Sequence, residues 1–325
     1  MHKAADILAI LADGTFHSGQ DLAQQLALSR SGVWKSVQYL QSCGLDVFAV
    51  RGKGYRLTRP VELLNQTLIQ QAVSPLMQAH LEGVEVHWRV DSTNRYLLER
   101  VLTNVGSGYT CVAEMQTLGR GRRGRQWISP LGGNIYLSQL WRFSTGPAQL
   151  SGLSLATAIA IVRAISALGL GNVGVKWPND VLINHKKIAG ILLEINGESA
   201  GPSNVVAGVG INVRLSTEAL AQIDQPCTDL ESHLQQPFRR NQFVALLITE
   251  LLSVYQQFSL HGFDYFREEW CKFDLYKDQQ VNLIAGTGNI TGINRGVDHQ
   301  GALRLEQNGQ VTSYQSGEIS MRAVR

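Results

Sequence analysis

The hydrophobic pattern of this chain changes twice along its length, and these changes constrain the fold more than any other feature. The first sixty residues are typical of short helices followed by a hairpin, strands alternate with helices from about Leu81, and the last fifty residues alternate as short strands. The 325 residues also exceed what one hydrophobic core usually accommodates. The sequence therefore predicts a multidomain α+β protein with domains at 1–62, 83–273 and 274–325 and a linker at 63–82.

Composition indicates a globular protein from a reducing compartment. Hydrophobic residues make up 44% and charged residues 17% of the chain, unlike a disordered sequence. The apolar stretch that begins at Leu155 is broken by Arg163, short of the ~20 residues that span a bilayer. The apolar run 7–12 lies between Asp6 and Asp13, unlike a signal peptide. We therefore expect no membrane segment. The four cysteines form no CxxC pair, so we also expect no disulfide framework, no structural zinc and a cytoplasmic location.

Positive charge is concentrated at the N-terminal end. Residues 1–60 hold seven Lys/Arg against four Asp, which accounts for the whole net charge of +3, and the rest of the chain is neutral. Residues 22–61 contain six basic residues and a single acidic residue, Asp46. A solvated basic face is the common explanation of charge alone, so the local structure must decide whether this region binds nucleic acid.

The N-terminal segment matches a helix-turn-helix. Helices are predicted at 4–12, 19–27 and 30–42. Ser18 and Ser29 can cap the second and third helices. Val33, Val37 and Leu40 follow helical spacing along the third helix and predict its buried face. Two helices separated by so short a turn are typical of this DNA-binding motif.

A short hairpin follows and completes a winged helix. Strands at 46–50 and 55–57 are joined by the tip Arg51-Gly-Lys53-Gly, which can follow a phosphate backbone. A winged helix that serves only protein contacts is the alternative, and we favour DNA binding because charge, caps and wing agree. The residues expected to reach DNA are Ser29, Arg30, Ser31, Lys35, Ser36, Gln38, Arg51 and Lys53.

The central region predicts a mixed sheet with helices rather than a regular βαβ series. Strands are predicted at 84–90, 109–115, 135–141, 173–177, 181–184, 188–195 and 205–209. One helix opens after Asp91-Ser92-Thr93-Asn94 and runs through Leu102, and a long apolar helix covers 150–168.

A glycine- and arginine-rich segment at 119–127 carries the strongest local signal. Its sequence, Gly-Arg-Gly-Arg-Arg-Gly-Arg-Gln-Trp, formally contains GxGxxG, but Pro130 and the glycines after it oppose the helix that a dinucleotide-binding turn requires. Four arginines on a flexible loop can instead bind carboxylate and phosphate. Their mutual repulsion predicts a loop that is disordered without a ligand. No Walker A sequence occurs.

Three polar clusters lie at or near the ends of predicted strands. They are Lys176-Trp-Pro-Asn179-Asp180, the pair Lys187 and Gly190, and the glycine-rich stretch 208–212 that ends in Asn212. Each alone has an ordinary explanation as a surface lysine or a turn glycine. Together with the arginine loop they predict an active site that handles anions.

These motifs together resemble the biotin–protein ligase family, in its bifunctional bacterial form that also represses the biotin operon. The resemblance rests on Asp91–Asn94, Gln116, 119–125 with Trp127, 176–180, 187–190, 208–212, 295–298 and 317–320. It covers nearly the whole chain, although 215–236 contains no recognised motif. It implies a class II synthetase-like central sheet and a C-terminal SH3-like β-barrel, whose strands are expected at 280–285, 289–294, 302–305, 311–313 and 318–323.

The resemblance implies a two-step reaction. Biotin's carboxylate attacks the α-phosphate of ATP, giving biotinyl-5′-AMP and pyrophosphate, and a lysine of the biotin carboxyl carrier protein of acetyl-CoA carboxylase then displaces AMP. Lys187 is implied to bridge the carboxylate and the α-phosphate, with Arg122 over the phosphates. Asp180 is our hypothesis for the group that orients or deprotonates the acceptor lysine, because only about one lysine in 10³ is neutral at pH 7.

The resemblance also implies the binding residues. Biotin is implied to lie against Ser92, Thr93, Asn94, Gln116, Arg120, Gly121, Arg122, Lys187 and Gly190. ATP or the adenylate is implied to contact Arg122, Arg123, Arg125, Trp127, Lys176, Asn179, Lys187 and Asn212. No dedicated metal site is expected, since Mg²⁺ would arrive with ATP.

The resemblance further implies that biotinyl-AMP acts as co-repressor and promotes a homodimer that binds operator DNA. A ligand that stabilises the dimer raises its affinity for DNA, because the two binding equilibria are linked. Three alternatives stay open: a ligase whose winged helix has no operator, a ligand-sensing regulator without chemistry, and a lipoate ligase. Lys187 with the complete arginine loop argues against a sensor alone, and the lipoate signature Arg-Arg-x-Ser-Gly-Gly-Gly is absent.

Overall fold

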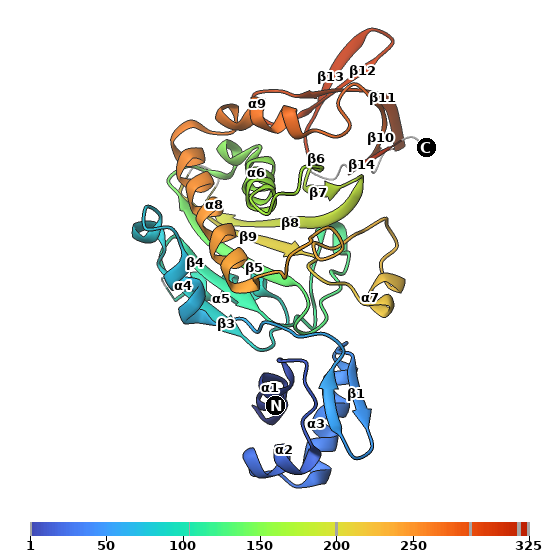
Figure 1. Cartoon of the computed structure of the whole chain (residues 1–325). Helices are drawn as coiled ribbons and strands as arrows, with labels where there is room; N and C mark the ends of the chain where they lie inside the picture. Colours follow the sequence, from blue (N-terminus) through green and yellow to red (C-terminus); the bar gives the residue numbers. More distant parts are fainter. Residues whose placement is uncertain (1, 104, 199–200, 286–287, 317–319, 324–325) are drawn as a thin grey trace.

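The computed structural model describes the chain except residues 1, 104, 199–200, 286–287, 317–319 and 324–325, and it shows three successive units (Figure 1). The N-terminal unit lies at one end of the molecule, and the C-terminal strands lie at the other. The central unit between them holds the largest sheet and most of the helices. The predicted order of domains is therefore the observed one.

The N-terminal unit is a winged helix. Its elements are α1 (His2–Leu11), α2 (Gly19–Gln25), α3 (Arg30–Ser42), β1 (Val47–Val50) and β2 (Gly54–Leu57). Both predicted caps form, since Ser18 accepts a hydrogen bond from the Asp21 amide and Ser29 from that of Gly32. The three apolar residues predicted to face the core of α3 are fully buried.

The central unit is built on a seven-stranded sheet. Its strands are β3 (Gly83–His87), β4 (Tyr109–Ala113), β5 (Ile135–Phe143), β6 (Val173–Lys176), β7 (Asp180–Ile183), β8 (Lys186–Gly197) and β9 (Ser203–Ile211). Their order across the sheet is β3-β4-β5-β9-β8-β7-β6, with β3 and β4 parallel and the other pairs antiparallel. The mixed sheet predicted from the sequence is confirmed, and β7, β8 and β9 place their polar ends next to one another.

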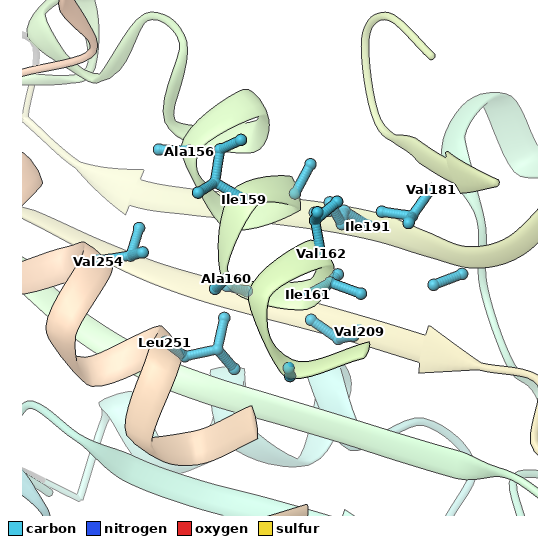
Figure 2. Packing of buried hydrophobic residues seen from close by; sticks show 14 of the residues in the cluster. Ala156, Ile159, Ala160, Ile161, Val162, Val181, Ile191, Val209, Leu251 and Val254 are labelled. Carbon is cyan, nitrogen blue, oxygen red and sulfur yellow. The ribbon is translucent and has the colours of Figure 1, made fainter. Parts of the chain in front are cut away.

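Helices of the central unit pack against this sheet, with the exception of the short α7 (Thr217–Ala221). The others are α4 (Gln66–Ala72), α5 (Thr93–Val101), α6 (Leu153–Ser166), α8 (Arg240–His261) and α9 (Asp264–Phe273), with 3₁₀ turns at Gln78–His80, Arg122–Gly124 and Pro147–Leu150. Figure 2 shows Ile191 and Val209 of the sheet near α6, and Leu251 and Val254 of α8 on another side of that helix. The segments Pro147–Ser166 and α8 have the length and hydropathy of membrane spans, but 67% and 56% of their apolar windows are buried within the protein, as in core helices.

The segment 63–82 differs from the predicted linker. It contains α4, whose Ile69 is fully buried in the core of the central unit, and α4 packs against α8. Asn65 caps α4 by accepting from the Leu68 amide. The prediction did not consider that Leu64, Ile69 and Val73 give the segment one apolar side. This side is buried, so the segment folds onto the core instead of spanning a gap.

A buried ion pair of the central unit lies at its junction with the N-terminal unit. Arg240 Nη1 lies 2.6 Å from Glu114 Oε2, and both side chains are almost fully buried. Arg240 also donates to the carbonyl oxygen of Glu62, at the end of the winged helix. The Leu131 amide donates to the Cys43 carbonyl just after α3, at 3.0 Å. The winged helix therefore rests directly on the central unit.

The C-terminal unit is a five-stranded antiparallel sheet. Its strands are β10 (Gln280–Ala285), β11 (Gly288–Val297), β12 (Leu303–Gln307), β13 (Gln310–Tyr314) and β14 (Ser320–Ala323), in the order β13-β12-β11-β10-β14. All five predicted strands are present, although 317–319, which carry most of the last family motif, lie outside the described residues. The Trp177 indole donates to the Gly301 carbonyl at 3.1 Å and ties this sheet to the central unit.

Candidate active site

A cavity of about 1020 Å³ lies where β7, β8 and β9 meet the arginine loop. The structure brings together every residue that the sequence assigned to biotin or ATP. The cavity is lined by Ser92, Thr93, Asn94, Gln116, Arg120, Gly121, Arg122, Arg123, Arg125, Trp127, Lys176, Asn179, Asp180, Lys187, Gly190 and Asn212. These residues come from segments up to 120 positions apart, so the fold and not local sequence assembles the site.

The start of α5 forms a buried polar wall of the cavity. The Thr93 amide donates to Gln116 Oε1 at 2.9 Å. Asn94 Nδ2 donates to Glu194 Oε2 at 2.8 Å. Ser138 Oγ of β5 lies 2.7 Å from Thr93 Oγ1 and 2.6 Å from Asn94 Oδ1. These contacts hold the polar groups in fixed positions, as recognition of a ligand with polar ring atoms requires.

Two lysines and one carboxylate meet at the ends of β6, β7 and β8. Lys187 Nζ lies 2.6 Å from Asp180 Oδ1, and Lys176 Nζ lies 3.7 Å from Asp180 Oδ2. Burial lowers the pKa of Lys176, and the charge of Asp180 opposes this shift. Two cations therefore share one carboxylate in a partly enclosed site, and an incoming anion would balance the excess positive charge.

The arginine loop covers this cluster. Arg120 Nη2 lies 2.8 Å from Glu194 Oε2, and Arg122 donates to Asn179 Oδ1 at 3.2 Å and to the Ser316 carbonyl. Burial lowers the pKa of Arg122, which places its charge in a weakly solvated position. The sequence predicted a disordered loop, but the structure gives it a defined conformation. Carboxylate and carbonyl groups of the protein accept hydrogen bonds from these arginines, whereas the prediction assumed that only a ligand would do so.

Trp127 joins the loop to the floor of the cavity. Its ring packs over Gly190 and Gly210 of β8 and β9, where a Cβ would come within 2.9 and 2.5 Å of indole carbons. Lys187 Nζ lies 5.5 Å from the centre of the same ring. The indole Nε1 is buried without a hydrogen-bond partner within the described chain. Both glycines are therefore required for Trp127 to lie flat against the sheet.

Several lining residues were not predicted. Residues 222–227, from the stretch without a motif, form one side of the cavity, and the Lys187 amide donates to the Pro226 carbonyl at 2.9 Å. Tyr276, Gln279, Met321 and Arg322 reach the cavity from around the C-terminal sheet. Ser138, which contacts Thr93 and Asn94 without lining the cavity, was also missed. No sequence signal marks these positions, because only contacts between segments distant in the sequence bring them to the site.

Across the described ranges, no three His, Cys, Asp or Glu side chains gather as metal ligands. Asp180 in the cavity and Glu194 beside it already form ion pairs with Lys187 and Arg120. A divalent ion carried by nucleotide phosphates would thus meet Asp180 and the arginine loop, and not a preformed cage.

The exposed face of α3 and the wing form a second candidate site. Arg30, Ser31, Lys35 and Gln38 are exposed as predicted, whereas Ser36 is half-buried. Trp34, which the sequence interpretation left out, is 53% exposed on α3. Arg51 and Lys53 are exposed at the wing tip. Within residues 2–62, none of these four cations forms an ion pair, so the face carries uncompensated positive charge.

Comparisons with known proteins agree with this geometry. Residues 86–212 match the model of the Biotin/lipoate A/B protein ligase family, 3–56 an HTH domain and 278–322 the Biotin protein ligase C terminal domain. The chain is 42% identical to the Bifunctional ligase/repressor BirA of Escherichia coli, covering 98% of this chain and 96% of that one. It is 33% identical to the Biotin–[acetyl-CoA-carboxylase] ligase of Paracoccus denitrificans, covering 67% and 91%.

A solved structure supports the same assignment. The biotin protein ligase from Aquifex aeolicus in complex with biotin and ATP superposes with a TM-score of 0.64 at 28% identity, covering 74% of this chain and 99% of that one. The central and C-terminal units thus share the ligase fold, while the full-length match to the E. coli protein includes the winged helix. The chain belongs to the biotin–protein ligase family, in its bifunctional ligase/repressor form.

Proposed function

We propose that this protein activates biotin with ATP to biotinyl-5′-AMP and transfers the biotinyl group to a lysine of the biotin carboxyl carrier protein of acetyl-CoA carboxylase. The contact between Lys187 and Asp180 beneath the arginine loop carries the proposal, because the cations gathered in this cavity can neutralise a carboxylate and a phosphate together. Relatives named as biotin ligases support the substrate class.

The first step needs charge neutralisation more than proton transfer. Biotin's carboxylate is ionised at pH 7 and can attack the α-phosphate directly. Both reactants are anions, so fixed positive groups lower the barrier. Lys187 would donate to the carboxylate and the α-phosphate, while Arg122 would lie over the phosphates and Mg²⁺ would accompany ATP. Pyrophosphate leaves as the phosphorus–carboxylate oxygen bond forms.

The second step needs a neutral amine. Asp180, which contacts Lys187, would accept a proton from the acceptor lysine or orient it, once ligand phosphate has drawn Lys187 away from Asp180. The amine then attacks the acyl carbon and AMP leaves. Asp180→Asn should therefore slow transfer more than adenylation. Equal slowing of both steps in single-turnover assays would refute this role.

The direct test of ligation uses the purified carrier protein. After incubation with biotin, ATP and Mg²⁺, mass spectrometry should find one biotinyl group on one lysine of the carrier. A carrier variant with arginine at that lysine is the control and should stay unmodified. Absence of any modification while pyrophosphate is released would contradict transfer, and absence of both would contradict the ligase assignment.

We infer a cytoplasmic location, where the carrier is made.

We also propose that biotinyl-AMP acts as co-repressor, promoting a homodimer that binds the biotin operator through α3 and the wing. The uncompensated positive face and the likeness to ligase/repressors support this. A mobility shift on the biotin-gene promoter of the source genome should require biotin and ATP together. No shift under any condition would leave a ligase whose winged helix does not act on this operator.

A further inference from the structure

We propose that Arg56, clamped between Phe16 and Phe48, forms a phosphate-binding site on the wing for the backbone of duplex DNA. This inference rests on the DNA-binding function proposed above and adds a residue that neither the sequence motifs nor the wing tip indicated. It concerns affinity for the sugar–phosphate backbone and not the reading of base sequence.

The hairpin register places Arg56 on the outer side of the wing. Val47 pairs with Leu57, and both are buried in the core of the winged helix. The next pair, Phe48 opposite Arg56, must face the other way, because successive side chains of a strand alternate. Phe48 is 45% exposed, as expected for this outer face.

Two aromatic rings hold the guanidinium. Its central carbon lies 5.0 Å from the centre of the Phe16 ring and 5.3 Å from that of Phe48. Both distances are within the ~6 Å range of cation–π attraction. Phe16 comes from the loop after α1, so the clamp joins two separate segments and limits the rotamers of Arg56. The loss of entropy on binding a partner is then smaller.

The clamp leaves the hydrogen-bond donors of Arg56 unused. Arg56 Nε is buried and has no hydrogen-bond partner within residues 2–62 or elsewhere in the described chain, and no carboxylate pairs with this guanidinium. A structural arginine normally binds a carboxylate or a carbonyl oxygen. Cation–π contact with two rings holds the group in place, while its terminal nitrogens can still form the paired hydrogen bonds that phosphate accepts.

Neighbouring charge favours an extended polyanion as the partner. Lys53 Nζ lies 5.9 Å from the centre of the same Phe16 ring, so a second cation adjoins the clamp. Arg51 is exposed at the tip of the hairpin, and Asp46 is the one acidic residue between 22 and 61. A line of cations along one hairpin matches the repeated phosphates of a DNA strand, whose binding releases counterions.

The test measures DNA affinity against salt concentration. Fluorescence anisotropy would follow the full-length protein, with biotin, ATP and Mg²⁺ present, on the biotin-gene promoter duplex and on a scrambled duplex of equal length. Arg56→Gln should weaken binding to both duplexes about fivefold per protomer and reduce the slope of log K against log salt by about 0.9 per protomer. Arg304→Gln, an exposed arginine on β12, is the matched control and should change neither value.

Further variants separate a phosphate contact from a structural role. Arg56→Lys should keep the salt slope but lose part of the affinity, because an ammonium cannot stack as a planar group. Phe48→Leu should also keep the slope and weaken binding about two- to threefold, because the charge remains but is less ordered. An affinity loss with Arg56→Gln at unchanged slope, or no loss at all, would overturn the proposal. If the wild-type chain bound neither duplex, the proposed DNA function itself would fail.

Discussion

Two glycine-rich basic loops in this protein differ in how their cations are held. In the arginine loop at 119–127, Arg120 contacts Glu194 and Arg122 contacts Asn179, so two of the four arginines are held by protein groups beside the cavity. In the wing, Arg51 and Lys53 face solvent and Arg56 is held by aromatic rings instead of carboxylates. Similar composition thus produces an enclosed site in one place and an open surface in the other.

The difference corresponds to the size of the ligand. A small acyl nucleotide can be enclosed, and enclosure strengthens each charge interaction because water is excluded. A DNA duplex cannot be enclosed by a domain of this size, so its contacts stay exposed and sensitive to salt. We therefore expect changes in the two loops to affect different functions.

Loss of the Lys187 cation should have the largest effect. Lys187→Met should slow adenylation about 10³-fold, because the carboxylate and α-phosphate lose the group that neutralises both. Single-turnover pyrophosphate release measures this rate. Lys186→Met, at the exposed neighbouring lysine, is the matched control and should remain near wild type. A comparable loss in both variants would show that general charge, and not the position of Lys187, matters.

Displacement of Trp127 should have the next largest effect. Gly210→Ala would place a Cβ 2.5 Å from an indole carbon and push the loop away from the cavity floor. We expect adenylation to fall about 10²-fold, since a shift of about 1 Å in a positioned group can cost that much. Gly171→Ala, which meets no neighbouring atom, is the control. Unchanged pyrophosphate release in Gly210→Ala would contradict the close packing of Trp127 on the sheet.

Removal of the two cations at the wing tip should act only on DNA. The double variant Arg51→Gln/Lys53→Gln should weaken binding to any duplex about 25-fold per protomer and leave adenylation unchanged. Anisotropy and pyrophosphate release on the same preparation would check both. A parallel fall in adenylation would show that the two loops are not functionally separate.

The alkaline limb of the pH profile should show the smallest effect. Because burial lowers the pKa of Lys176, its charge is lost at a lower pH than that of an ordinary lysine. Adenylation should therefore decline as pH rises toward the ordinary lysine pKa, and Lys176→Arg should lessen this decline a few-fold, since arginine stays charged. Identical alkaline limbs in the two proteins would argue against a charged Lys176 in the reaction.

Local sequence signals predicted the start of a helix, its buried side and the position of the cavity. Ser29 marked the start of α3, and the spacing of Val33 and Leu40 identified its buried side. Gly190 and the glycine-rich stretch 208–212 were predicted as parts of the site, although the packing of Trp127 on Gly190 and Gly210 was visible only in the structure. Clusters at strand ends indicated the cavity because a sheet brings such ends together.

Features that depend on long-range pairing escaped prediction. Ser138 looked like an ordinary strand residue until Thr93 and Asn94 were placed beside it. The segment 222–227 has no pattern of its own and acquires its position by pairing with the start of β8. The arginine loop was expected to be disordered because its like charges repel one another. Its acceptors, Glu194 among them, lie far away in sequence and were not predicted.

Hydrogen exchange measured by mass spectrometry tests the contrast between the two loops most directly. Addition of biotin, ATP and Mg²⁺, without DNA, should slow amide exchange in residues 119–127 by at least tenfold. The bound ligand would fix the arginine side chains of this loop, and with them its backbone. Residues 51–54 at the wing tip should then slow only when duplex is added. Unchanged exchange at 119–127 in the presence of bound biotinyl-AMP would contradict the account.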